Sequence, residues 1–215
     1  MNRLMTGLAL LALAATSPAC ANPAADASKA VTTEATARPR PPAVNAAEEK
    51  LPVTGENSRI EFVGSKVTGS EGGRFEKFSG TLHLVDAMPE RSRVEIAIDM
   101  NSVATDSNGL AEHLKNADFF DAPKFPEATF VSTEIKPGGE KGATHTVTGN
   151  LDLHGVRKAV TFPATIKVDA GGAALDAEFA INRKDFDITY AGRADDLIRD
   201  EVVIKLRVRA PRAEG

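Results

Sequence analysis

Apolar and polar residues alternate one for one in several segments of the chain between residues 93 and 208. In the segment RVEIAIDM, Val94, Ile96 and Ile98 fall on one side of an extended backbone, whereas Arg93 and Glu95 fall on the other. Such alternation is typical of an antiparallel strand with one face in the core and one in water. The same pattern recurs in residues 147–153, 160–168, 175–181 and 202–208.

Further strands are predicted from shorter or less regular segments. A first strand begins near Ile60, and residues 128–135 form another with weaker alternation. Between these, Phe75 is out of phase with Phe78, and a bulge near Lys77 would restore the alternation within one strand. The total is about eight strands.

Turn-forming residues separate the strands. Pro137-Gly138-Gly139 and Gly171-Gly172 are strong breakers, and His154-Gly155 indicates a tight hairpin. Residues 106–116 carry a helical spacing instead, and Thr105 or Asp106 can cap the helix predicted there. We therefore expect an all-β domain with one short helical insertion.

Strands with one apolar face can close as a barrel or stack as a sandwich. A barrel removes exposed edges, and at about eight strands its interior either fills with side chains or encloses one small ligand. Tryptophan is absent, and Gly80, Gly149 and Ala164 on the inner rows would leave room for a guest. The pattern alone leaves both architectures open.

The N-terminus has the layout of a secretory signal peptide. Arg3 supplies a positive charge, and residues 4–15 form an apolar run of 12 residues that ends in small side chains. The run is shorter than the roughly 20 residues that a membrane-spanning helix needs. Residues 1–19 are predicted to be removed on export, which places the mature protein in the periplasm.

The single cysteine, Cys20, leaves two processing routes open. Cys20 is either lipidated as the first residue of an outer-membrane lipoprotein, or cleavage after Ala21 removes it. Ala19 and Cys20 match a lipobox, but Ser17 stands where Leu or Val is usual. An unpaired thiol is a liability in an oxidising compartment, which favours lipidation. A lipid anchor would be the only membrane contact.

Composition separates a tail from a domain. Residues 20–50 are rich in Ala, Pro and charge and lack an aromatic residue, so they are predicted to be a disordered linker before a domain spanning residues 51–215. The net charge is −4, and the basic residues are scattered. Nucleic-acid binding needs a concentrated positive surface, so that class of partner is not expected.

Several segments together resemble the YceI-like lipid/polyisoprenoid-binding family. They are FEKFSGTL at 75–82, HLKNADFFDAPKFPEATF at 113–130, GNLDLHGVRKAVTFP at 149–163 and INRKDFDI at 181–188. One departure is Asp187, where a Gly often follows the Phe. The resemblance implies a lipocalin-like, eight-stranded antiparallel β-barrel with a short helical insertion. It also implies an exported protein whose barrel holds a polyisoprenoid or a long-chain lipid.

The inner rows of the strands are the predicted wall of the ligand site, although core packing is the alternative role for each residue alone. Phe119 and Phe120, after the helix, either line the cavity mouth as a lid or plug the core. Arg183 faces inward by parity, so it needs an ion-pair or carbonyl partner or else anchors a polar head group. The complete predicted ligand-binding set is Phe78, Leu82, Ile96, Ile98, Phe119, Phe120, Val147, Leu151, Phe162, Ile166, Phe179, Ile181 and Arg183.

No spacing in the sequence indicates a metal site, a catalytic nucleophile or a nucleotide loop. The expectation is a non-enzymatic periplasmic carrier of an apolar lipid, with no cofactor beyond the bound isoprenoid or long-chain lipid. The alternative is an envelope interaction or stress-response module with a filled barrel. A homodimer and a monomer both stay open.

Overall fold

The computed structural model describes residues 22–37 and 47–212. Nearly all of the regular structure is strand. The elements of the large sheet are β1 (Ser28–Lys29), β2 (Val31–Glu34), β3 (Glu48–Thr54), β4 (Arg59–Lys66), β5 (Gly69–Phe75), β6 (Phe78–Val85), β7 (Met88–Asp99), β8 (Val103–Thr105), β9 (Glu127–Pro137), β10 (His145–Leu153), β11 (Val156–Asp169), β12 (Gly172–Asn182) and β15 (Glu201–Pro211). A separate hairpin pairs β13 (Gly192–Arg193) with β14 (Asp196–Leu197).

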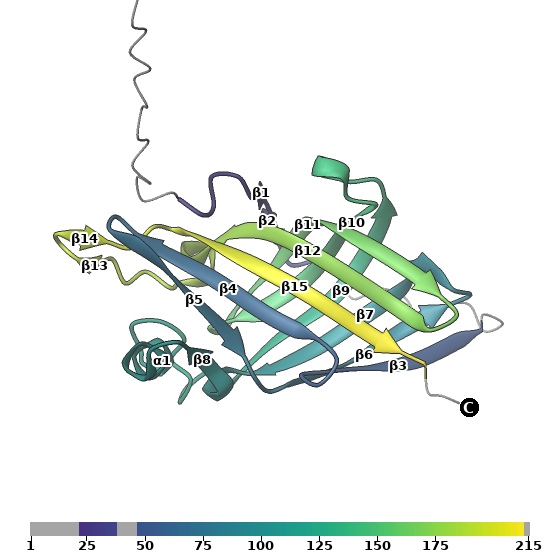
Figure 1. Ribbon diagram of the computed structural model, residues 1–215, viewed down its shortest axis with the longest axis horizontal. Coiled ribbons are helices and arrows are strands. Elements are labelled where there is room, and N and C mark those ends of the chain that lie inside the picture. Colours follow the sequence, from purple (N-terminus) through teal and green to yellow (C-terminus); the bar gives the residue numbers. More distant parts are fainter. Residues whose placement is uncertain (1–21, 38–46, 213–215) are drawn as a thin grey trace, which may run out of the picture.

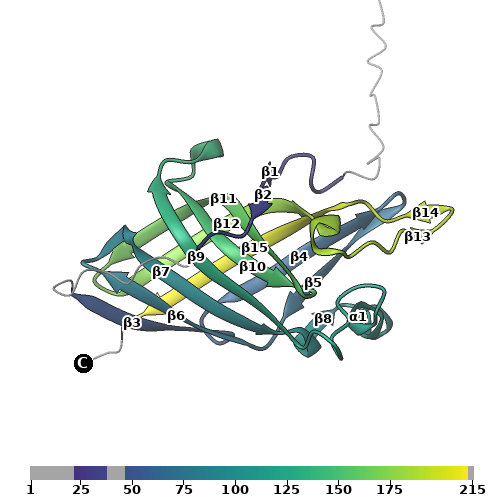
Figure 2. The same cartoon turned by 180° about the vertical axis from the view of Figure 1, so that it is seen from behind.

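The large sheet curls round on itself (Figures 1 and 2). Most of its buried side chains are apolar. Its strand order is β3-β6-β7-β9-β10-β11-β12-β15-β4-β5-β8, with antiparallel neighbours along this path. Side chains join the β3–β4 turn to β15, because the Ser58 hydroxyl accepts from Arg209 N at 2.9 Å and donates to Arg209 O at 3.2 Å. The all-β, barrel-like fold is confirmed.

The sheet has more strands than the predicted eight. The segment predicted to be one bulged strand breaks into two, since β5 ends at Phe75 and β6 begins at Phe78. At the break, the Glu76 and Lys77 amides donate to the backbone oxygen and hydroxyl of Ser102, at 3.1 and 3.0 Å. Because Ser102 satisfies these amides, the chain can turn a corner there without the predicted bulge.

A bulge is present instead in β9. Thr148 pairs with Glu134 but Gly149 pairs with Ser132, so Thr133 has no residue opposite it. The extra residue reverses which face the following side chains occupy. This reversal explains why the alternation in residues 128–135 is weak.

The helix α1 (Asn108–Lys115) begins two residues later than predicted, after Ser107. Thr105 does not cap it. The Thr105 hydroxyl accepts from Ser107 N at 3.2 Å and donates to Ser107 O at 2.6 Å, so it orders the turn before the helix. Three short 3-10 helices complete the described elements: η1 (Met100–Ser102), η2 (Glu140–Gly142) and η3 (Arg183–Phe186).

Strands β11 and β12 pair at one end only. Residues 165–169 pair with residues 172–176, and beyond them the strands diverge into a fork between residues 156–164 and 177–182. Within the fork, β1 pairs in parallel with β12, and β2 pairs antiparallel with β11. We call residues 22–36, which bridge the fork, the N-terminal strap.

A disordered linker was predicted for residues 20–50; the strap and β3, which begins at Glu48, correct this prediction for residues 22–36 and 48–50. Residues 38–46 lie outside the described residues. The unpaired backbone edges of β11 and β12 supply partners for the strap, which therefore needs no apolar core of its own. Residues 1–19 and Cys20, for which export and lipidation are predicted, lie outside the described residues.

Candidate functional site

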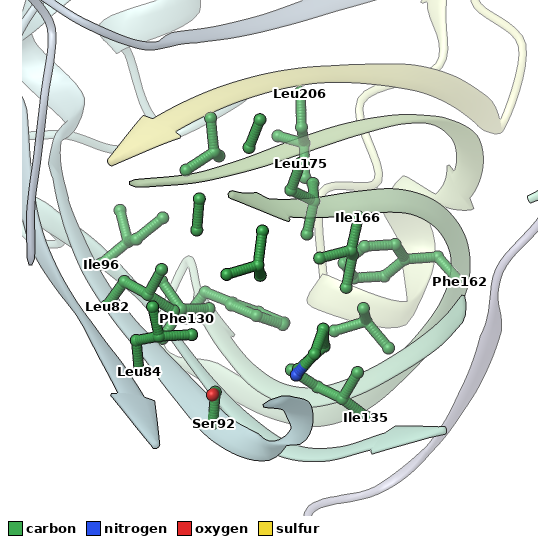
Figure 3. Close-up of a pocket in the computed structure, with 17 residues that line it drawn as sticks. Leu82, Leu84, Ser92, Ile96, Phe130, Ile135, Phe162, Ile166, Leu175 and Leu206 are labelled. Atoms are coloured by element: carbon green, nitrogen blue, oxygen red, sulfur yellow. The ribbon is translucent and has the colours of Figure 1, made fainter. Parts of the chain in front are cut away.

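An apolar cavity lies inside the barrel at the end formed by the β6–β7 and β11–β12 turns (Figure 3). The volume of this cavity is about 70 Å³. Ligand pockets are commonly about 300–1,000 Å³, so this cavity is narrow. Its lining residues are Leu82, Leu84, Pro89, Ser92, Val94, Ile96, Phe130, Ile135, Val147, Phe162, Ile166, Val168, Ala173, Ala174, Leu175, Leu206 and Val208.

The lining offers no unpartnered polar side chain. Ser92 is its one polar residue, and the Ser92 hydroxyl accepts from Val85 N at 3.0 Å and donates to Met88 O at 2.6 Å. Both bonds lie within the β6–β7 hairpin. A guest in this cavity would therefore gain contacts with apolar groups and would find no hydrogen-bonding side chain there.

Two phenyl rings limit the cavity. Phe130 lies against Gly149, where a Cβ atom would stand 2.2 Å from the Phe130 Cζ atom. Phe162 stacks on Phe179 with ring centroids 4.1 Å apart. Gly149 was expected to leave room for a guest, but the room beside it is taken by the Phe130 ring.

Five predicted ligand-binding residues line the cavity: Leu82, Ile96, Val147, Phe162 and Ile166. Their contact with a ligand stays a prediction. The others do not line it. Phe78 and Ile98 pack in a cluster with lining residues such as Leu84, while Leu151, Phe179 and Ile181 belong to the cluster around Phe162.

Phe119 and Phe120 lie at the opposite end of the barrel from the cavity. Phe120 packs edge-on against Phe62 at 6.1 Å between centroids and also contacts Phe75. Phe119 contacts Tyr190, with centroids 5.4 Å apart. Both pack against the cluster of Phe62 and Leu114 beside α1, and neither is among the residues that line the cavity.

Arg183 is buried at the start of η3, where its guanidinium holds the following loop. Nε donates to Arg199 O at 3.1 Å, and the two terminal nitrogens donate to Ile188 O at 2.6 Å and Ile198 O at 3.4 Å. The Asp200 carboxylate lies 3.6 Å away. Burial lowers the pKa of Arg183, and the nearby Asp200 charge opposes that shift. This arrangement is the structural alternative to head-group binding.

Twelve of the seventeen lining residues were absent from the predicted set. For several of them, such as Val94, Leu175 and Leu206, the alternation in the sequence did predict that the side chain faces inward. The alternation does not predict where along the barrel axis the interior stays open. Phe130 and Ile135 have opposite parity, so their joint presence depends on the bulge at Thr133.

Within residues 22–37 and 47–212, no three His, Cys, Asp or Glu side chains gather in a way that could hold a metal ion. In that same part of the chain, no helix has the length and hydropathy needed to span a membrane.

The curled antiparallel sheet and its apolar interior define a lipocalin-like barrel. Residues 52–210 match the model of the YceI-like domain, and the chain belongs to that family. A UPF0312 protein of Pseudomonas putida (strain W619) is 34% identical over 167 residues, covering 74% of this chain and 86% of the relative. Protein YceI of Salmonella newport (strain SL254) is 36% identical over 151 residues, covering 67% and 78%.

Solved structures have the same fold. BcnA of Burkholderia cenocepacia superposes with a TM-score of 0.63 at 28% identity, covering 70% of this chain and 94% of that one. A polyisoprenoid binding domain from Saccharophagus degradans, implicated in plant cell wall breakdown, superposes with a TM-score of 0.58 at 20% identity, covering 76% and 100%. At that identity the second likeness concerns the fold alone.

Proposed function

We propose that this protein is an exported carrier that holds the chain of an apolar lipid, such as a polyisoprenoid, inside its barrel. The observation that carries the proposal is the cavity itself, where the single polar side chain is already satisfied by the β6–β7 backbone. Membership of the YceI-like family supports the proposal, and the Saccharophagus degradans domain of the same fold is named for polyisoprenoid binding.

The binding energy would come from burial of the chain. Each methylene transferred from water contributes about 0.8 kcal/mol, so ten carbons contribute about 8 kcal/mol before the cost of immobilisation is subtracted. Selectivity would then depend on the length and branching of the chain. Since the cavity is narrow, a long guest must displace side chains such as Phe130 and Phe162.

The narrow interior also favours the second candidate, an envelope interaction module with a filled barrel. In that case the side chains around Phe162 and Phe179 would keep their contacts, and the outer face would carry the function. The two candidates differ in whether the purified protein contains a lipid.

The test is to purify the exported protein in its native state and to extract it with organic solvent. We expect mass spectrometry to identify a prenyl or long-acyl molecule. As a matched pair, Val147→Arg places a charge in the cavity wall, whereas Thr148→Arg places one on the outer face of the same strand. Loss of the lipid from the Val147 variant alone supports the proposal. Extracts from several hosts that contain no such molecule contradict it.

The location is part of the proposal. The apolar run at residues 4–15 and the small residues before Cys20 support export to the periplasm, with Cys20 as the anchor of an outer-membrane lipoprotein. The intact mass of the mature protein decides the route. A diacylated N-terminal Cys20 supports the anchor, and an unmodified chain that begins at Asn22 excludes it.

A further inference from the structure

The fork between β11 and β12 begins next to a proline. Pro163 has no backbone N–H, and the ladder with β12 begins only at Thr165. On the other side of Pro163, β11 pairs with the strap up to Thr161. The wall of the barrel is therefore continuous along β11 only because the strap supplies the missing partner.

The two ends of the strap are held to different extents. Its N-terminal end lies on β12 and β15, where Ala24 is 0% exposed and Ser28 is 5% exposed. Ala30 N donates to Ala180 O at 2.8 Å, and Lys29 pairs with Glu201 at 2.5 Å. This end is packed as part of the barrel.

The C-terminal end of the strap is more exposed than the N-terminal end, although β1 pairs only two residues with β12 and Lys158 on β11 pairs with Glu34 at 2.6 Å. The β2 ladder on β11 has four residues, and its Val31 side chain is 60% exposed. Beyond it, Asn150 on β10 accepts from Thr36 N at 2.9 Å and donates to Thr36 O at 2.8 Å. Backbone hydrogen bonds of exposed ladders open at a lower free-energy cost than those of buried ones, and this exposure distinguishes the C-terminal end.

The fork lies beside the filled part of the interior. Phe162 on β11 and Phe179 on β12 stack across it, and Ala30 of the strap packs against the same cluster. The cavity ends at Phe162, while Leu151 and Ile181 fill the space beyond. A guest longer than the cavity must move the stacked Phe162 and Phe179 rings apart, and a wider fork between β11 and β12 would give them room.

We propose that residues 31–36 of the strap detach from β11 and β10 to let the fork open, while residues 22–29 stay on β12 and β15. The strap then acts as a clasp that sets how long a lipid chain the barrel admits. The proposal rests on the lipid-carrier function. It gives the predicted residues Leu151, Phe179 and Ile181 a place in the lengthened cavity.

A disulfide across the detaching ladder tests the proposal. Thr33 and Ala159 are directly paired, so Thr33→Cys with Ala159→Cys, in the full chain carrying Cys20→Ser, can lock β2 to β11. The control lock is Glu178→Cys with Lys205→Cys, a pair in the β12–β15 ladder that need not open. Uptake of a lauroyl and an arachidoyl probe with the same fluorophore is followed before and after reduction.

We expect the oxidised Thr33–Ala159 lock to slow uptake of the arachidoyl probe by at least about tenfold, with full recovery on reduction, because closure of the fork blocks a gating motion. The lauroyl probe should be slowed less, and the control lock should slow neither probe. Asn150→Ala, which frees Thr36, should speed arachidoyl uptake. Equal rates in the locked and reduced forms would overturn the clasp.

Hydrogen exchange separates failure of the clasp from failure of the carrier function. If the unlocked protein takes up neither probe, the carrier proposal fails. The clasp is then judged from the amides of residues 31–34, which should exchange at least about 100-fold faster than those of the β12–β15 ladder if they detach. Equal protection of the two ladders overturns it without reference to any ligand.

Discussion

Single residues explain both the shape of the cavity and the error in predicting it. Gly149 was correctly placed on an inner row, but its neighbour on the next strand decides what fills the space beside it. That neighbour is the Phe130 ring, which approaches Gly149 because β9 carries a bulge at Thr133. Alternation within one strand shows which residues face inward, but not which residue of the next strand lies beside each of them.

The contact between Phe130 and Gly149 predicts the effect of enlarging the glycine. In Gly149→Ala the new methyl group would lie 2.2 Å from Phe130 Cζ and 2.8 Å from the Val131 carbonyl oxygen, so both the ring and the backbone must shift. We expect a loss of about 1–3 kcal/mol in the free energy of unfolding, measured by urea denaturation. The double variant with Phe130→Leu should recover the part of this loss that comes from the ring. If the losses of the two single variants simply add, the contact does not carry the effect.

Asp187 predicts a change in the opposite direction. It ends η3 with φ of 57°, a left-handed conformation that favours glycine, and it is the position where the family resemblance suggested a glycine. We expect Asp187→Gly to raise the free energy of unfolding by about 0.5 kcal/mol. Asp185→Gly, within η3, is the control and should lower it. If Asp187→Gly instead lowers the free energy of unfolding, the Asp187 side chain itself stabilises the fold.

At the scale of elements, the clean alternation predicted the strands that pair over long ladders, such as residues 145–153 and 201–211. It failed where backbone partners come from distant segments. The strap has no alternation, because the edges of β11 and β12 satisfy its amides. Arg183 was recognised as buried, but its carbonyl partners in the 188–199 loop have no signature in the sequence.

An ion pair joins Glu49 on edge strand β3 to Arg212, which follows β15. The stability of β3 in the sheet should therefore depend on pH. The Glu49 carboxylate accepts from Arg212 Nε at 2.6 Å, and this hydrogen bond lowers the pKa of Glu49 from its ordinary value of 4.5. A carboxyl group whose pKa is lowered on folding stabilises the fold above its ordinary pKa. That contribution is lost as the pH falls through the lowered value.

We therefore expect the β3 amides to lose protection relative to the β12–β15 ladder when the pH is lowered from neutral to below 4.5, the ordinary value for Glu49. Hydrogen exchange measures this difference. Glu49→Gln should show weaker β3 protection already at neutral pH and a smaller change on acidification. If Glu49→Gln has the same pH profile as the wild-type protein, the ion pair with Arg212 is not the cause of the pH dependence.

For the whole molecule, the resemblance predicted the barrel and its apolar interior, whereas the extent of the opening depends on packing that no local pattern encodes. A barrel that binds lipid only in its folded state must be stabilised by that lipid. At a free lipid concentration 100 times the Kd, the gain is about 2.7 kcal/mol.

The corresponding prediction concerns thermal unfolding. Protein stripped of lipid and then reloaded should melt about 5–10 °C higher than the stripped protein, as measured by differential scanning calorimetry. Val147→Arg, with its charge in the cavity wall, should show no such rise. An equal rise in both proteins would place the lipid outside the barrel.

The strap also has a consequence for solubility. Without it, the diverging edges of β11 and β12 would present unpaired N–H and C=O groups, which are templates for pairing with other chains. Deletion of residues 22–36 would thus convert a self-contained barrel into a molecule that can add strands from its neighbours. We expect this deletion to produce concentration-dependent oligomers, which light scattering measures.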